Sequence, residues 1–146
     1  MITVSEVLKA KGHQVHSTQP DTTILHAVDA MCRAHVGALL VVERSMPVGI
    51  ISERDVMTRV ILARCDPAKT KVGDVMTTDI VCIGVDCSIE EAMAVMTERR
   101  CRHLPAVVDG RVVGIISIGD LVRMASKSHE YEIQLLHEYL AGRYPG

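Results

Sequence analysis

Residues 49–55 read Gly-Ile-Ile-Ser-Glu-Arg-Asp, and residues 114–120 read Gly-Ile-Ile-Ser-Ile-Gly-Asp. The two stretches lie 65 positions apart in a chain of 146 residues, and each places an apolar run directly before Ser-x-x-Asp. Repetition at a fixed spacing indicates a repeat architecture. A serine hydroxyl and a carboxylate three residues apart, at a turn from a strand into a helix, can grip a ribose. The duplication therefore predicts two related clefts.

The repeat extends well beyond this phrase. Residues 13–55 align with residues 78–120 without a gap, and twelve of the 43 aligned positions are identical. Upstream, residues 4–8 resemble residues 72–76 at an offset of 68, so the first copy has three extra residues near Lys9–Gln14, where we expect a longer loop. We expect a first domain over 1–65, a linker over 66–71, a second domain over 72–126 and a C-terminal helix and tail over 127–146.

The composition favours a folded protein with an aliphatic core. The chain is 48% hydrophobic, yet it contains no Phe or Trp and only three Tyr. Each repeat of about 60 residues buries a core poorly on its own, so we expect the two repeats to pack together. Single-stranded nucleic-acid binding relies on aromatic platforms. With a net charge of −2 and no basic block, the chain shows no nucleic-acid footprint.

The sequence also argues against a membrane protein and a metal site. No apolar run approaches the roughly 18–20 residues of a membrane span, and the N-terminus lacks the pattern of a signal peptide. The five cysteines form no CxxC pair, which predicts reduced, buried thiols in the cytoplasm. The seven histidines are dispersed without metal-ligand spacing, so we expect no metal site.

Apolar periodicity predicts a β-α-β-β-α order in each half. The spacing of apolar residues over 24–34 is helical, and Ser88 with Glu91 forms a capping box that begins the matching helix of the second copy. We expect the first hairpin to turn at Ser45-Met46-Pro47 and the second at Asp109-Gly110. A further helix over 128–141 should present Ile133, Leu136 and Leu140 on one face, which folds back or meets a partner, and stop at Gly142.

A tandem β-α-β-β-α unit in which each copy ends in Gly-(apolar)₂-Ser-x-x-Asp resembles the CBS domain pair, the cystathionine-β-synthase-type or Bateman module. The resemblance covers about residues 1–126 and includes the phrases around Val81–Asp86 and Arg102–Val107. It implies an α/β (α+β) fold of two CBS units packed sheet to sheet with pseudo-twofold symmetry. It also implies a stand-alone regulatory protein that forms a homodimer and acts on a regulated protein partner.

The resemblance further implies that the clefts bind adenosine-containing ligands, namely AMP, ADP, ATP, S-adenosylmethionine or NAD(H), with no catalytic cofactor. By position, the ribose-binding roles fall on Ser52 and Asp55 in one site and on Ser117 and Asp120 in the other. A carboxylate can accept hydrogen bonds from both ribose hydroxyls. The following helix directs its N-terminal N–H groups toward a phosphate.

The two predicted sites differ in their charge. The first copy has Arg54 where the second has Gly119, whereas the second copy has Arg102 and His103 where the first has Gly37 and Ala38. Each of these cations is a candidate for phosphate binding, and each fits a solvated or packed surface residue equally well. We expect two unequal sites that share a ribose grip and need not bind the same molecule.

Three other interpretations remain open from sequence alone. Ser-x-x-Asp before an apolar stretch is itself an N-terminal helix cap, so the chain also fits a structural interaction protein with empty clefts. A redox or metal sensor would use the scattered Cys and His residues. An enzyme is not expected, because no nucleophile–base pair is evident.

Overall fold

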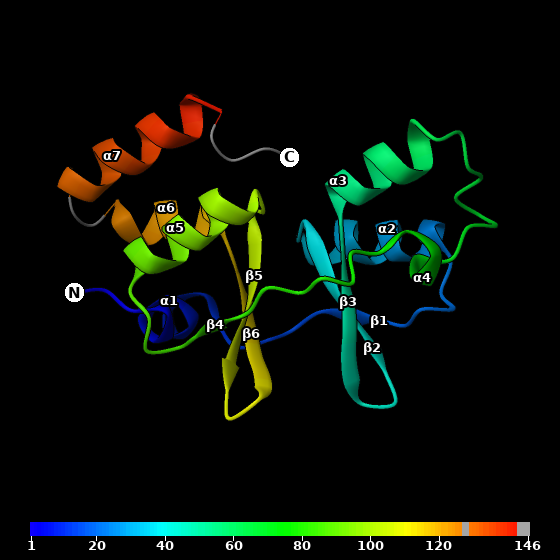
Figure 1. The fold of residues 1–146 in the computed structure, drawn as a ribbon, viewed down its shortest axis with the longest axis horizontal. Coiled ribbons are helices and arrows are strands. Elements are labelled where there is room, and N and C mark those ends of the chain that lie inside the picture. The colour runs from blue at the N-terminus through cyan, green and yellow to red at the C-terminus, as the bar shows by residue number, and fades with distance from the viewer. Residues whose placement is uncertain (127–128, 143–146) are drawn as a thin grey trace. The chain divides into compact units, whose positions relative to one another are not determined.

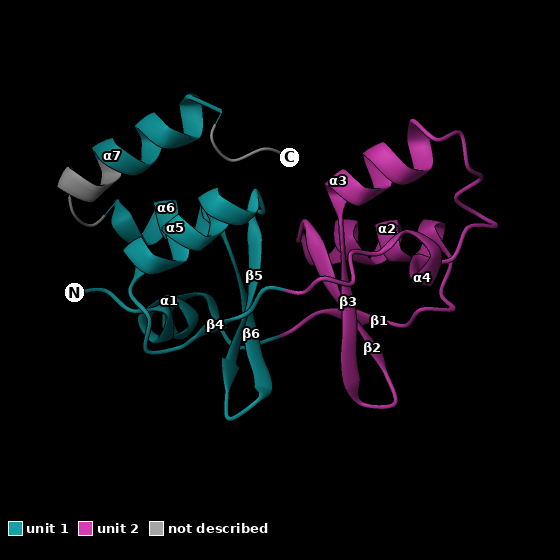
Figure 2. Cartoon of the chain, in the orientation of Figure 1, with its two compact units in different colours: residues 1–14, 81–146 teal, residues 15–80 magenta. Residues whose placement is uncertain are grey.

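The computed structural model describes residues 1–126 and 129–142, without the side chains of 129–132. Residues 127–128 and 143–146 of the predicted tail lie outside this description. The chain forms two compact units, coloured separately in Figure 2: unit 1 comprises Met1–Gln14 and Val81–Gly146, and unit 2 comprises Val15–Ile80. No helix of the described residues is long and apolar enough to cross a membrane.

Unit 2 contains a three-stranded sheet covered by helices (Figure 1). The strand order is β1-β2-β3, with β1 parallel to β2 and β2 antiparallel to β3. Ile24, Leu39 and Ile51 are at most 1% exposed and lie in one aliphatic core. The elements in chain order are β1 (Ser17–Thr18), α2 (Ile24–Ala34), β2 (Ala38–Glu43), β3 (Met46–Ser52), α3 (Glu53–Val56), the π-helix η1 (Met57–Ile61) and α4 (Val72–Val75).

Unit 1 repeats this plan with a second three-stranded sheet in the order β4-β5-β6. Ile89, Leu104 and Ile116, which align with the core residues of unit 2, are again almost fully buried. Two three-stranded sheets with helices confirm the predicted mixed α and β fold class, while the sheet-to-sheet packing of the units stays a prediction. The elements are α1 (Val4–Lys11), β4 (Ile83–Gly84), α5 (Ile89–Arg99), β5 (His103–Val108), β6 (Arg111–Ser117), α6 (Ile118–Ala125) and α7 (His129–Leu140).

The opening helices of the two repeats are exchanged between the units. Helix α1 precedes the first repeat but packs in unit 1, where the Val4 N–H donates to the carbonyl of Cys87 at 2.8 Å. Helix α4 opens the second repeat but packs in unit 2, where the Val72 N–H donates to the carbonyl of Thr22 at 2.8 Å. Residues 1–14 therefore belong to a different compact unit from the rest of the expected first domain, because their apolar side chains complete the other core.

One glycine in each unit allows this close packing. A Cβ atom on Gly114 would lie 2.4 Å from Cδ2 of Leu8 in α1, and a Cβ atom on Gly49 would lie 2.9 Å from the backbone oxygen of Thr77. Side chains essentially never approach so closely without displacing a neighbour. The glycines of the repeated phrase are therefore needed where each exchanged segment crosses the sheet.

Two local predictions need correction. The first hairpin turns at Arg44 and Ser45, both with positive φ, and Met46 and Pro47 already belong to β3. Two residues with positive φ form the type I′ turn that matches strand twist, as they do at Asp109 and Gly110, where the predicted turn is confirmed. The expected longer loop near Lys9–Gln14 is wrong as well, because the extra residues lengthen α1 to eight residues against four in α4.

The C-terminal helix packs through a different face from the predicted one. Leu135 is 7% exposed and belongs to the core of unit 1, whereas Ile133, Leu136 and Leu140 are 61%, 37% and 82% exposed. Helix α7 contacts α6. It is followed by Gly142 with a φ of +75°, as a helix stop requires.

We predict that Gly114→Ala lowers the free energy of unfolding by roughly 1–3 kcal/mol, because the added methyl group overpacks a closed core. Gly84→Ala is the matched control, since its Cβ would meet nothing closer than 3.9 Å. In a double-mutant cycle with Leu8→Ala, urea denaturation should show a double mutant more stable than the sum of the single changes predicts. Strict additivity would mean that Gly114 does not accommodate Leu8.

Candidate functional site

In unit 2, Ser52 and Asp55 form a reciprocal cap where β3 turns into α3. The Asp55 N–H donates to Oγ of Ser52 at 3.2 Å, and the Ser52 N–H donates to Oδ2 of Asp55 at 3.0 Å. The remaining oxygen, Oδ1, accepts from the Thr77 hydroxyl at 3.1 Å. Asp55 is only 8% exposed, and the hydrogen-bond donors found around its carboxylate are uncharged. The turn therefore holds a buried carboxyl group whose hydrogen-bond partners are uncharged.

Unit 1 repeats this cap with charged partners. The Ser117 N–H donates to Oδ2 of Asp120 at 2.8 Å, and the Asp120 N–H donates to Oγ of Ser117 at 3.2 Å. Lys11 Nζ lies 2.7 Å from the same Oδ2 and also donates to the carbonyl oxygen of Ile115 at 2.6 Å. Arg123 pairs with Oδ1. The longer α1 thus brings a lysine to Oδ2 of the carboxylate, and Arg123 takes the oxygen that the Thr77 hydroxyl contacts in unit 2.

These contacts set the charge state of Asp120. Burial alone would raise the pKa of Asp120, but hydrogen bonds from Lys11 and Ser117 and the Lys11 charge outweigh burial and hold the pKa below its ordinary value of 3.8. The Asp120 side chain is 3% exposed, that of Lys11 32% and that of Arg123 73%. The carboxylate is therefore a buried anion, with one fixed and one accessible cation.

The structure brings the predicted residues of each copy together within one unit. In unit 2, Ala38 is paired with Ser52 in the sheet, and the Glu53 N–H donates to the Gly37 carbonyl at 2.9 Å. The same register in unit 1 pairs His103 with Ser117. There, the Ile118 N–H donates to the Arg102 carbonyl at 2.9 Å. Arg102 and Gly37 therefore lie at matching positions beside the N-terminus of the last helix of the repeat.

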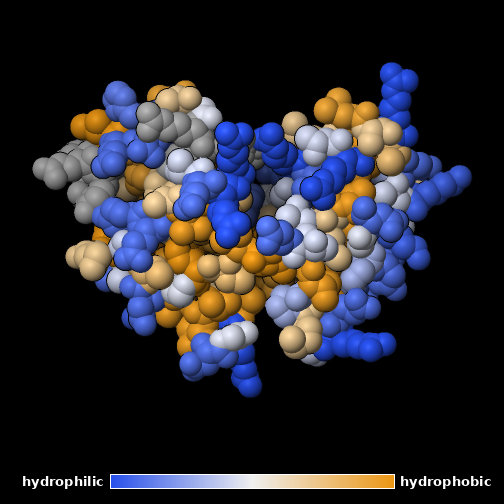
Figure 3. Space-filling view, in the orientation of Figure 1, coloured by the Kyte–Doolittle hydropathy of each residue, from blue (hydrophilic) through white to orange (hydrophobic). Residues whose placement is uncertain are grey.

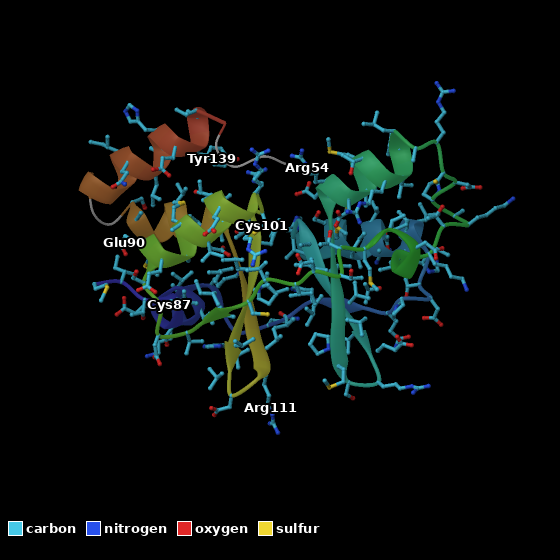
Figure 4. All side chains as sticks on the ribbon, viewed as in Figure 1. Arg54, Cys87, Glu90, Cys101, Arg111 and Tyr139 are labelled. Atoms are coloured by element: carbon cyan, nitrogen blue, oxygen red, sulfur yellow. The ribbon has the colours of Figure 1, made fainter. Side chains whose placement is uncertain are left out.

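The arginines on these last helices occupy different positions. Arg54 lies at the start of α3 with an exposed side chain (Figure 4). In unit 1 this position is Gly119, and a Cβ atom there would lie 3.7 Å from Nη1 of Arg123. Arg123 therefore folds back over the beginning of α6, so that a cation lies beside Asp120 despite the glycine.

Arg102 is held by the C-terminal helix. Its Nη2 donates to the hydroxyl of Tyr139 in α7, and its guanidinium carbon lies 5.1 Å from the centre of the Tyr139 ring. Its Nε is buried and has no hydrogen-bond partner within the described part of the chain. A buried, unpaired N–H group costs about 1–3 kcal/mol. Arg102 is thus incompletely satisfied in this arrangement. Tyr139 is labelled in Figure 4.

Sequence reasoning missed four residues of these two sites: Thr77, Lys11, Arg123 and Tyr139. Thr77 and Lys11 lie outside the repeated phrase, and only the exchange of α1 and α4 places them at the carboxylates. The sequence does offer one sign of Arg123: Gly119 has no side chain, which leaves space at the start of α6 for the arginine one turn later. Tyr139 has no counterpart in the first copy, because α7 follows the second repeat alone.

The cysteines correct another prediction. Cys32, Cys65 and Cys82 are exposed, while Cys87 and Cys101 are half-buried. All five are free thiols, but the expected burial is wrong, because three are exposed and the other two are only partly buried. Burial raises the pKa of the Cys87 and Cys101 thiols, which makes them poorer nucleophiles at neutral pH. Among the side chains that the structure describes, those of residues 1–126 and 133–142, no group of three Cys, His, Asp or Glu could hold a metal ion.

Comparison with known proteins identifies the class. The CBS domain model matches residues 4–62 and 72–127, so the chain belongs to the CBS-domain family. It is 36% identical to the mitochondrial CBS domain-containing protein CBSX3 of Arabidopsis thaliana over 97% of this chain and 73% of the relative.

Solved structures agree with this assignment. The CBS domain protein NE2398 is 39% identical, with a TM-score of 0.81 over 85% of this chain and 97% of the other. A candidate signal-transduction protein with CBS domains from Burkholderia ambifaria MC40-6 is 36% identical, with a TM-score of 0.83 over 86% of this chain and 95% of the other. The fold is therefore that of the CBS-domain pair.

We predict that Asp120 stabilises unit 1 in a pH-dependent way. Because the pKa of Asp120 is lower in the folded than in the unfolded state, the folded protein binds fewer protons than the unfolded chain near this pH. The stabilisation is therefore fully present above about pH 3.8, the ordinary pKa, and is lost as the pH falls through the lower pKa of the folded state. Asp120→Asn and Lys11→Met should both flatten the loss of stability between about pH 5 and pH 2 in urea denaturation. An unchanged pH profile in both variants would contradict this role.

Proposed function

We propose that the protein is a non-catalytic regulatory module that binds adenosine-containing ligands through the Asp55 and Asp120 turns. The observation that carries the proposal is the duplicated, buried carboxylate, held at a strand-to-helix turn beside backbone N–H groups. A helix cap alone does not require a carboxylate to be buried beside a second segment of the chain. The family assignment supports a role in regulation and signal transduction.

Each carboxylate can accept the two hydroxyl groups of a ribose by exchanging one partner. In unit 2 the exchangeable donor is the Thr77 hydroxyl on Oδ1 of Asp55, and in unit 1 it is Arg123 on Oδ1 of Asp120. The caps from Ser52 and Ser117 remain in place, because they use Oδ2. Ligand binding therefore needs no rearrangement of the turn backbone.

The test is binding of AMP, ADP, ATP, S-adenosylmethionine and NAD(H) to the whole chain, measured by calorimetry and thermal shift. At least one should bind, and Asp55→Asn combined with Asp120→Asn should reduce its affinity at least tenfold, because charge-assisted hydrogen bonds contribute about 1.5–3 kcal/mol each. Native mass spectrometry of protein purified from cells would reveal nucleotide that co-purifies. Failure of all five ligands would favour a structural interaction protein with empty clefts.

The two sites should differ in ligand charge. A neutral nucleoside that displaces Arg123 from Asp120 leaves the arginine without a partner, whereas a phosphorylated ligand gives Arg123 a new anion. Unit 2 displaces only a hydroxyl, and the exposed Arg54 is the cation closest in sequence to its turn. Unit 1 should therefore discriminate more strongly between a nucleotide and its nucleoside.

We predict that Arg123→Gln lowers the ratio of AMP affinity to adenosine affinity by about tenfold in unit 1, the value of one charged hydrogen bond. Calorimetry with the Asp55→Asn background isolates this site. The matched control is Arg111→Gln, an exposed arginine on the distal hairpin (Figure 4). An unchanged ratio would exclude Arg123 as the selectivity residue, and the same measurement with Arg54→Gln tests the other turn.

A homodimer in the cytoplasm belongs to the same proposal. Met57 and Ile61 of η1 and the following Leu62 are 60%, 60% and 76% exposed. The space-filling view shows hydrophobic surface among the polar surface of the molecule (Figure 3). Met57, Ile61 and Leu62 in unit 2, and separately the exposed residues of α7 in unit 1, offer surface for self-association or for a regulated protein partner. Free thiols at exposed positions suit a reducing compartment.

A further inference from the structure

We infer that Tyr139 of α7 occupies the position of a ligand phosphate on Arg102, so that a phosphorylated ligand loosens the C-terminal helix when it binds unit 1. This inference rests on the proposed function and says how ligand binding at unit 1 would change the surface of the protein. It depends on the state of Arg102, on the contacts that hold α7 and on the charge of α7.

Of the two N–H groups on one edge of the Arg102 guanidinium, Nη2 has a hydrogen-bond partner and Nε has none among the described residues. A guanidinium group binds phosphate in a bidentate way through two parallel N–H groups. Here Nη2 donates to a neutral phenol, and the neighbouring Nε is buried without a partner in the residues that the structure describes. A phosphate offers both a negative charge and a second acceptor, so it is a better partner than Tyr139 for the same edge.

The position of Arg102 brings this edge to the ribose-binding turn. Its carbonyl accepts the Ile118 N–H, and the next residue pairs with Ser117 across the β5–β6 ladder, so the backbone of Arg102 lies beside the turn. A ligand whose ribose contacts Asp120 and whose phosphate lies at the beginning of α6 is then within reach of the Arg102 side chain. The ligand and Tyr139 compete for one guanidinium, which couples ligand binding to the docking of α7.

Helix α7 is held lightly enough for this coupling to matter. Leu135 is its one buried large apolar residue among those with described side chains. A groove of about 410 Å³ separates α7 from α5, between Met93 and Thr97 on α5 and Gln134 and Glu138 on α7. Loss of the Arg102 contact would therefore remove a hydrogen bond and a ring contact that join the helix to β5.

The charge of α7 acts in the same direction. Residues 129–142 contain three glutamates and no lysine or arginine. A phosphate beside a docked acidic helix is repelled, and this repulsion is relieved when the helix moves away. Undocking would expose Leu135 and the outer face of α5, which provides a surface for a partner in the ligand-bound state alone.

The test combines affinity and hydrogen exchange on the full chain. Tyr139→Phe keeps the ring and removes the competing hydroxyl, so AMP affinity at unit 1 should rise by about three- to tenfold while adenosine affinity is unchanged. In the wild-type protein, saturating AMP should speed amide exchange in α7 several-fold. Arg102→Gln should abolish this response, and Arg99→Gln, an exposed arginine at the end of α5, should retain it.

Three results overturn the inference: the same AMP affinity in Tyr139→Phe and wild type, α7 exchange that AMP leaves unchanged, or an AMP response that survives Arg102→Gln. Inorganic phosphate separates this inference from the proposed function. If phosphate speeds exchange in α7 through Arg102 but no nucleotide binds, the adenosine-ligand proposal fails and the exchange of Tyr139 for an anion stands. If nucleotides bind through Asp120 and α7 does not respond, the adenosine-ligand proposal stands and the inference about Tyr139 fails.

Discussion

The exchange of the two opening helices is the constraint on which the rest of this structure depends. Each repeat has too few residues to close its own core, and each core is completed by the segment that opens the other repeat in the chain. Gly49 and Gly114 make this possible, because any side chain at those positions would collide with the crossing segment. The same crossing brings Thr77 and Lys11 to the two carboxylates. The exchange of the opening segments thus determines both the packing of each core and the side chains beside each carboxylate.

Three additional residues in the first copy account for the inequality of the two sites. They extend α1 beyond the length of α4, and the last residue of the longer helix is Lys11. A lysine and an arginine then neutralise Asp120, whereas the Asp55 carboxylate accepts from the Thr77 hydroxyl. Buried charges are stable only when they are paired or well hydrogen-bonded. Both carboxyl groups have hydrogen-bond partners, but only Asp120 has a cation, Arg123, on the oxygen assigned to the proposed ligand.

The capping and ligand-binding interpretations of Ser-x-x-Asp are compatible in this fold. The serine and the backbone use one carboxylate oxygen for the helix cap, and the second oxygen faces a partner from elsewhere in the chain. A cap therefore fixes the orientation of the carboxylate in advance, which reduces the cost of ordering it around a ligand. Arg102, whose carbonyl accepts the first N–H of α6, is in turn contacted by Tyr139 of α7. The C-terminal helix is therefore connected to the turn that holds Asp120.

The sequence by itself determined the repeat, the β-α-β-β-α order, the start of α2 at Ile24 and of α5 at Ile89, and the pairing of Ser52 with Asp55 and of Ser117 with Asp120. These features depend on periodicity, capping and turn chemistry within a few residues, which a sequence displays directly. Tertiary structure alone decided which unit receives α1, which side chains meet each carboxylate, and that α7 docks through Leu135 rather than through Ile133, Leu136 and Leu140. Those outcomes depend on contacts between residues far apart in the chain, where the burial of a whole face outweighs any local preference.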